Sequence, residues 1–292
     1  MLAGVNARLK ELSRRGNDWV ERQEPDSPTG VAIGAWLRYR AVEGPLQTAL
    51  LSLYILVAVL PALLVMEEYL DPHPNSLANS ITHHYRLNAS TSELIHNVLG
   101  EGRSHELGSA LIAIASALIF GIGFGHVLQI VHARAWQLDL KTGLGDQIGY
   151  GAVLAGLYGL LMLLLLQLND FHPRSTVVKV LLGLGWVGFL ILFFVVVPWL
   201  LTHKQVAPRD LLPSAALTAV GLVVLMVVSR FVMPSWIDLY ARDYGGLGVV
   251  LAIYFWIAFS SALIVWTASL SPALAERRDV RASGADAKAA GP

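Results

Sequence analysis

The chain alternates between long apolar runs and short polar connections. Because a helix rises about 1.5 Å per residue, about 20 apolar residues cross a hydrocarbon core about 30 Å thick. Six runs of roughly this length contain no Lys, Arg, Asp or Glu: Gly44–Met66, Leu107–Ile130, Gln147–Leu168, Val180–Leu201, Leu211–Ser229 and Gly245–Leu270. Backbone amides in lipid must be paired internally, so each run predicts a helix. We therefore predict an all-α polytopic membrane protein with six transmembrane helices.

The polar connections divide the chain into three regions. Residues 1–43 form a basic N-terminal arm, and its last part, Val31–Arg40, carries Trp36 and Tyr39 beside arginines, as interfacial segments do. Residues 44–274 form the transmembrane domain, with an external loop at 67–106 and spans near 44–66, 107–130, 147–168, 180–201, 211–233 and 245–270. Residues 275–292 are rich in Ala and Gly, and we expect them to be a disordered tail.

The distribution of charge gives the helices an orientation. Fifteen basic residues lie on the face that holds both chain ends and five lie on the opposite face, while Arg230 falls near the end of the fifth run. By the positive-inside rule, both termini are expected in the cytoplasm. The first 40 residues contain no apolar signal peptide, which favours insertion into the cell membrane.

Composition excludes several classes of chemistry. Only 14% of residues are charged, against about 25% in soluble domains. The chain has no cysteine, so disulfides and thiolate chemistry are impossible. A formal net charge of zero gives no sign of a nucleic-acid partner. Membrane lipids are the partners that this composition favours.

The external loop has two features of its own. Ser90 followed by Glu93 matches a capping box, which predicts a short helix over Thr91–Leu99. The loop also holds five histidines, a residue type that binds zinc well. Their spacing fits no standard motif, so we expect no metal site at His73, His83, His84, His96 and His105.

Polar groups inside the apolar runs are the functional candidates, because burying them in lipid is costly. His126 and Gln129 lie one turn apart on the second run, and Gln167 and Asp170 end the third. Arg230 is the one full positive charge within a hydrophobic segment. It either snorkels to the outer interface or faces an anionic head group or Asp170, and both alternatives stay open. His126 could equally be a hydrogen-bonded packing residue. We take these five residues as a hypothetical substrate pathway.

Small residues predict close helix contacts. Gly121 and Gly125 form a G-xxx-G step in the second run, and Gly151, Ala155 and Gly159 repeat every four residues in the third. Such spacing lets two helix backbones approach closely.

Signatures of soluble enzymes are missing from the sequence. It contains no G-x-x-x-x-G-K-S/T phosphate loop, no H-E-x-x-H and no G-x-S-x-G. A metal-dependent nuclease needs several converging carboxylates or histidines, whereas Asp139 and Asp146 are the only carboxylates between the second and third runs. We predict a protein that is not an enzyme, with no catalytic residue and no cofactor.

Several short motifs carry a family resemblance. Arg209-Asp-Leu-Leu-Pro-Ser-Ala-Ala216 opens the fifth run, and Tyr244-Gly-Gly-Leu-Gly248 opens the sixth, which continues through Phe255-Trp256. With Leu51-Ser-Leu-Tyr54 and Pro61, these motifs resemble the YihY/BrkB family of bacterial inner-membrane proteins over about residues 36 to 278. The chain departs from the family pattern at two places. Pro213-Ser214-Ala215 replaces Pro-Gly-Ala, and Thr267-Ala268-Ser269 replaces Gly-Ala-Glu, so that carboxylate is missing.

The resemblance implies a role at the bacterial envelope, since members are linked to envelope integrity, serum resistance and export of lipid A precursors. A tRNA-processing ribonuclease activity, also attached to the family, conflicts with the missing catalytic cluster. We expect an inner-membrane protein that transports or translocates an amphipathic or lipid envelope component. The alternative is a non-enzymatic scaffold for envelope integrity, which would bind assembly partners or form homo-oligomers.

Overall fold

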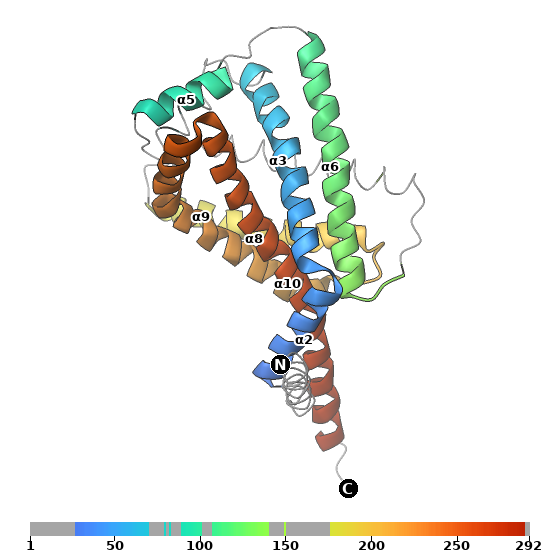
Figure 1. The fold of residues 1–292 in the computed structure, drawn as a ribbon. Coiled ribbons are helices and arrows are strands. Elements are labelled where there is room, and N and C mark those ends of the chain that lie inside the picture. The colour runs from blue at the N-terminus through green and yellow to red at the C-terminus, as the bar shows by residue number, and fades with distance from the viewer. Residues whose placement is uncertain are drawn as a thin grey trace, which may run out of the picture.

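The structure is a computed structural model, and it describes residues 27–69, 79, 82, 89–100, 107–139, 149 and 176–289. Its elements are all helices (Figure 1): α2 (Pro28–Ala41), α3 (Gly44–Tyr69), α5 (Ala89–Gly100), α6 (Leu107–Ala135), α8 (Thr176–Leu201), α9 (Pro208–Tyr244) and α10 (Gly246–Ala289). The predicted all-α class is confirmed. Apart from Gly149, the predicted third span lies outside the described residues, and so do Gln167 and Asp170.

Five of the six predicted spans coincide with helices, namely α3, α6, α8, α9 and α10. Among the described residues, α8, α9 and α10 are each long and apolar enough to cross a membrane, and the bent pair α2–α3 adds a fourth candidate. The protein is therefore a helical membrane protein. The full count of six spans and the cytoplasmic side of the termini stay predictions.

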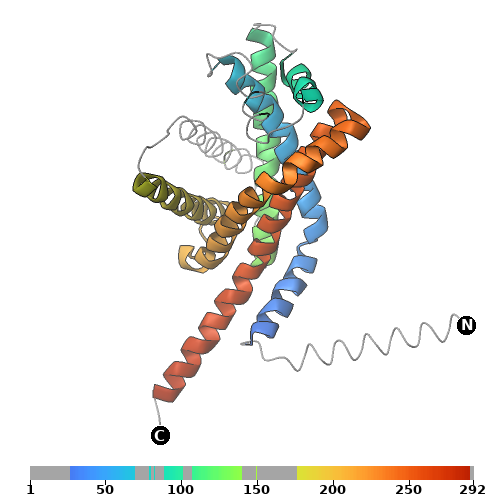
Figure 2. The ribbon, with the colours of Figure 1, turned by 90° about the vertical axis from the view of Figure 1, so that its left-hand side faces the viewer.

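Helices α3 and α6 lie side by side and run antiparallel (Figures 1 and 2). Two contacts fix their register: a Cβ on Gly123 would meet the Tyr54 ring at 2.3 Å, and Arg134 pairs with Glu43 at 2.6 Å. A close contact of the second span was predicted at Gly121 and Gly125, whereas the glycine that meets the Tyr54 ring of α3 is Gly123, between them. Gly125 is also buried, whereas the predicted stripe of the third span lies outside the described residues.

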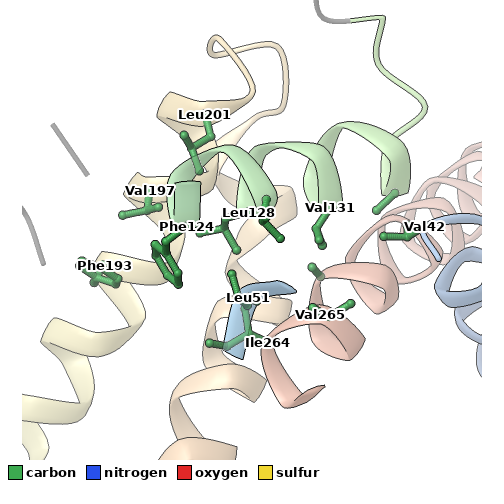
Figure 3. Close-up of a cluster of buried hydrophobic side chains, with 13 residues drawn as sticks. Val42, Leu51, Phe124, Leu128, Val131, Phe193, Val197, Leu201, Ile264 and Val265 are labelled. Atoms are coloured by element: carbon green, nitrogen blue, oxygen red, sulfur yellow. The ribbon is translucent and has the colours of Figure 1, made fainter. Parts of the chain in front are cut away.

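The largest hydrophobic cluster lies where α3, α6, α8 and α10 meet (Figure 3). Leu51, Val131, Val197 and Val265 are almost completely buried there. The first half of α8 extends away from this cluster (Figure 2), and its residues 177–178 and 180–185 are exposed in the described chain. The packed part of the molecule is thus centred on one end of α6.

The turn between α9 and α10 explains the glycines of the Tyr244–Gly248 motif. Gly245 has a φ of +60°, a conformation that side-chain-bearing residues rarely adopt. A Cβ on Gly248 would lie 1.9 Å from the carbonyl oxygen of Tyr240. Both glycines are therefore needed to reverse the chain and pack α10 tightly against α9.

Three segments outside the apolar runs can be compared with the predictions. The tail expected to be disordered from residue 275 continues α10 as a helix to Ala289. Alanine is the strongest helix former, and its abundance in this tail favours continuation of the helix. The predicted loop helix is confirmed as α5, which begins one residue before Ser90. The segment Val31–Arg40 lies within a helix, α2, which is capped by the side chain of Ser27, and its interfacial position stays a prediction.

Candidate functional site

A buried polar cluster joins the C-terminal half of α6 to the turn that follows α8. The side-chain nitrogen of Gln129 donates to the carbonyl oxygen of Leu201 at 3.0 Å and lies 3.3 Å from His203 Nε2. Because a carbonyl can only accept, the amide nitrogen must face this side, and His203 Nε2 is then the acceptor. Gln129 is only 5% exposed, so this predicted pathway residue is an internal one.

Neighbouring residues extend the cluster with neutral hydrogen bonds. Buried His132 donates from Nδ1 to the carbonyl oxygen of Leu128 at 2.9 Å, and buried Thr202 donates to Pro198 O at 2.8 Å. His203 and Lys204 both have positive φ angles, of 52° and 62°. The Gln129 bonds therefore stabilise a turn whose backbone conformation is unfavourable for residues with side chains.

Helix α3 brings a further polar side chain to the same level of the bundle. The antiparallel contacts Tyr54–Gly123 and Glu43–Arg134 set the register of α3 and α6. In this register Gln47 of α3 lies opposite residue 130 of α6, next to Gln129. Gln47 is 4% exposed, and within the described structure its Oε1 atom has no hydrogen-bond partner. A buried acceptor without a partner costs about 1–3 kcal/mol, so this level of the bundle is suited to a neutral polar group.

The other predicted pathway residues do not join this cluster. His126 is exposed on α6, although it lies only one turn from Gln129. Arg230 is exposed on α9, beside Phe231, whose side chain is 78% exposed. Gln167 and Asp170 lie outside the described residues, and so the pairing of Arg230 with Asp170 stays a prediction.

The position of Arg230 along α9 sets its depth. The uncharged run Leu211–Ser229 covers 19 residues, or about 28 Å of helix, which is close to the thickness of the hydrocarbon core. If that run crosses the core, Arg230 reaches the head-group layer. Its exposed position agrees with a cation that contacts lipid head groups from the outer surface of α9.

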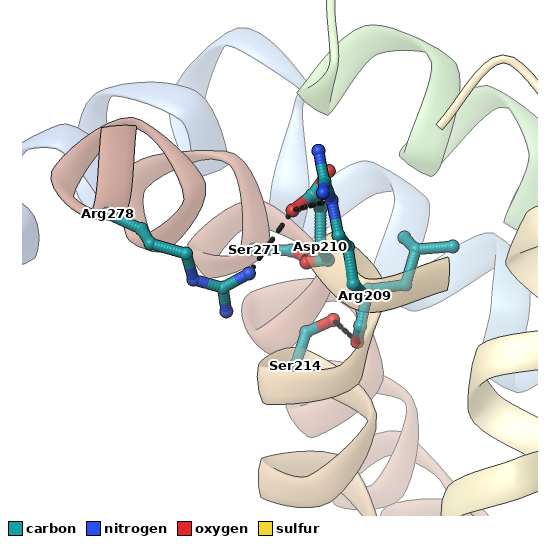
Figure 4. Close-up of polar contacts among 6 residues, drawn as sticks. Arg209, Asp210, Ser214, Ser271 and Arg278 are labelled. Atoms are coloured by element: carbon teal, nitrogen blue, oxygen red, sulfur yellow. Dashed lines mark hydrogen bonds and ion pairs between the residues drawn. The ribbon is translucent and has the colours of Figure 1, made fainter. Parts of the chain in front are cut away.

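Sequence reasoning missed a second polar cluster, at the start of α9 (Figure 4). Ser271 on α10 donates to the carbonyl oxygen of Asp210 at 2.8 Å, and Arg278 lies 3.3 Å from the Asp210 carboxylate. Further along the α9–α10 hairpin, the hydroxyls of Thr218 and Thr267 lie 2.7 Å apart and link the two helices again. The partners are 49 to 68 positions apart in the chain, so no local pattern indicates them.

The structure also bears on metal binding. In the ranges that the structure describes, no group of three or more His, Asp or Glu residues could hold a metal ion. Of the five loop histidines, only His96 lies within those ranges, on α5. The contacts at Gln129 connect α6 to the end of α8, and those at Asp210 connect α9 to α10.

Comparison with known proteins gives one match. Neither the curated proteins nor the solved structures yield a match to this chain. The family model described as "Virulence factor BrkB" matches residues 35–292, which include every described helix from the second half of α2 onwards. This range contains the motifs that resemble the family and both polar clusters. The chain is thus a member of the BrkB family of membrane proteins.

Proposed function

We propose that this protein binds and translocates an amphipathic or lipid component of the bacterial envelope, in the inner membrane. The exposed position of Arg230 is the observation that carries the proposal. A guanidinium at head-group depth forms charge-assisted hydrogen bonds with a phosphate. Phospholipids and lipid precursors of the envelope share such an anionic group.

The surroundings of Arg230 fit the rest of an amphipathic ligand. Met226 and Val227, one turn towards the membrane interior, are half exposed, and Phe231 is largely exposed. A phosphate at Arg230 would therefore have acyl chains running along the apolar side chains of α9. The protein is proposed to act without an enzymatic step, and it has no phosphate-loop motif for a nucleotide. Translocation would be passive or driven by an ion gradient.

A scaffold for envelope integrity is the second candidate, and α5 favours it. This loop helix lies over the end of the α9–α10 hairpin (Figure 1), where Thr91 donates to the Asp238 carboxylate at 3.0 Å. A helix fixed on that end offers a docking surface to assembly partners. In this case Arg230 anchors the protein to head groups without moving them.

Leaflet exchange in liposomes separates the two functions. Purified protein is reconstituted with head-group-labelled lipids, anionic and neutral in parallel, and exchange is compared between wild type, Arg230→Ala and Arg242→Ala. Arg242 is the matched control, because it is also an exposed arginine of α9 but lies about three helical turns further from the apolar run than Arg230. Loss of an arginine–phosphate contact of about 1.5 kcal/mol predicts roughly tenfold slower exchange of anionic lipid in Arg230→Ala alone.

Each result has a distinct meaning. Exchange that is slowed only by Arg230→Ala supports lipid translocation and assigns the head-group contact to Arg230. Equal exchange in all three proteins keeps the activity but removes Arg230 from it. If every protein leaves exchange at the level of empty liposomes, lipid translocation is rejected and the scaffold function is favoured.

A further inference from the structure

The chain bends between α2 and α3 at Val42 and Glu43, and this elbow fixes where α2 lies relative to the membrane. The uncharged run Gly44–Met66 of α3 corresponds to about 34 Å of helix, which is long enough to cross the hydrocarbon core. The axis bends by 64° between the two helices. Because α2 has 14 residues, or about 21 Å of helix, it rises only about 9 Å along the α3 axis. The head-group layer is about 5–8 Å thick on each side of the core, so α2 lies largely within it.

Specific contacts hold this bend in place. Glu43 at the elbow has a φ of +58°, and its carboxylate pairs with Arg134 of α6 at 2.6 Å. A Cβ on Gly44 would lie 2.2 Å from the ring of Tyr39, so a larger residue at the start of α3 would displace that ring. The bend is therefore held by the contact of Glu43 with α6 and by the packing of Tyr39 of α2 on Gly44.

The two faces of α2 have different environments. Val31 and Ala35 are buried against Leu270 and Ala273 of α10, and Arg38 pairs with Glu276. On another face, Trp36 is 54% exposed and Leu37 is 52% exposed, and Arg40 follows them at helical spacings of four and three residues. Trp36 stacks on Tyr39 with ring centroids 5.9 Å apart.

We propose that Trp36, Leu37 and Arg40 form a phospholipid-binding surface in the head-group layer beside the entrance of α3. Trp36 and Leu37 lie at the acyl boundary, and Arg40 binds the phosphate of an anionic lipid. Exposed Leu46 and Leu53 continue the apolar surface from the elbow along α3 into the hydrocarbon core. Membrane interfaces favour amphipathic residues: Trp and Tyr, which combine an apolar ring with a polar group, and Arg, which combines an apolar stem with a charge. This surface does not depend on lipid translocation at Arg230.

Single-cysteine variants test the surface directly, because the chain has no cysteine of its own. The full protein carrying Leu37→Cys is labelled with an environment-sensitive fluorophore and reconstituted in phosphatidylcholine and phosphatidylglycerol. Leu53→Cys, on the exposed membrane-crossing part of α3, is the lipid control. Gln205→Cys, exposed between α8 and α9, is the aqueous control. Quenching by lipids brominated on their acyl chains is compared with quenching by iodide in the buffer.

The expected result is strong lipid quenching at position 37, close to that at position 53, with little effect of iodide. Iodide quenching like that at position 205 would show a solvated helix and overturn the proposal. Protection from both quenchers would show that protein covers this face and would overturn it equally.

Arg40 is tested in the same system. In mixed liposomes, one charge near an anionic surface enriches anionic lipid by about fivefold, so brominated phosphatidylglycerol should quench the Leu37 label more than brominated phosphatidylcholine does. Arg40→Gln should remove this preference without removing the quenching itself. If the two lipids quench the Leu37→Cys label equally while Arg40 is still present, Arg40 does not bind anionic lipid.

Discussion

Hydroxyl side chains stand at the positions where this chain departs from the family pattern. Ser214 donates to the carbonyl oxygen of Leu211 at 2.8 Å, and Ser269 donates to that of Val265 at 2.9 Å. Thr267 makes a comparable bond within α10 and also contacts the hydroxyl of Thr218. The Thr267–Thr218 contact therefore links α10 to α9, whereas Ser214 and Ser269 satisfy their hydroxyls within their own helices. The missing carboxylate is replaced at Ser269 by a buried neutral group.

Gly248 gives a residue-level prediction about the family motif. We expect Gly248→Ala to destabilise the protein by about 1–3 kcal/mol, because the new methyl group would be forced against the α9 backbone and the tightly packed helices would have to separate. The measurement is the thermal unfolding of purified protein in detergent, followed by circular dichroism.

Gly188→Ala on α8 is the matched control for this change. No atom lies within 4 Å of the position that its Cβ would take, and alanine is favoured over glycine in helices by about 1 kcal/mol. This variant should unfold at the same temperature as wild type or higher. Equal stability of the Gly248 and Gly188 variants would contradict the role of Gly248 in packing α10 onto α9.

At the scale of elements, the apolar runs predicted helix positions well, because hydrophobic length follows directly from bilayer thickness. Helix ends were predicted less well. Both α9 and α10 continue beyond their apolar runs, to Tyr244 and Ala289, since helix propensity and pairing between helices do not stop at the edge of the membrane. The bend at Glu43 also gives no local signal, because Arg134 that holds it is 91 positions away.

The candidate site was only partly predictable for a related reason. Intramembrane polarity singled out Gln129, and the structure buries its side chain with two hydrogen-bond partners. The same reasoning grouped it with His126, yet the structure exposes that side chain. Tertiary packing decides which side of a helix faces its neighbours. In a helix that is apolar on all sides, the spacing of apolar residues does not indicate that side.

Helix α5 provides the element-level prediction. Thr91 is almost fully buried, and its bond to Asp238 is a specific contact between α5 and α9. Asp238→Ala would leave the Thr91 hydroxyl without this acceptor, at a cost of about 1.5 kcal/mol, or tenfold in a local opening equilibrium. We therefore expect amide hydrogen exchange across Ala89–Gly100 to become roughly tenfold faster.

Asp243→Ala is the control for this experiment, because Asp243 is an exposed carboxylate further along α9. Exchange in α5 should stay at the wild-type rate in that variant. Identical exchange rates in all three proteins would show that the Thr91 bond does not hold α5 in place.

At the scale of the whole molecule, the structure gathers basic side chains at one end. Ion pairs place Arg38 beside α10, Arg134 beside the α2–α3 elbow and Arg278 beside the start of α9. The turn that contains His203 and Lys204 lies at this end as well, through Gln129. The opposite end holds α5 and the α9–α10 turn (Figure 1). The charge asymmetry counted along the sequence is therefore a property of the folded molecule too.

This asymmetry leads to a prediction of orientation. Basic residues near helix ends are retained on the cytoplasmic side of a membrane, so the end with Arg38, Arg134 and Arg278 should face the cytoplasm. Gln205→Cys reports on that end, and Leu247→Cys reports on the α9–α10 turn; both positions are exposed. In intact cells with a permeabilised outer membrane, a membrane-impermeant maleimide should label position 247 alone. Position 205 should react only after the inner membrane is opened. The reverse pattern would place the basic end outside, and it would also move the surface formed by Trp36, Leu37 and Arg40 to the outer leaflet.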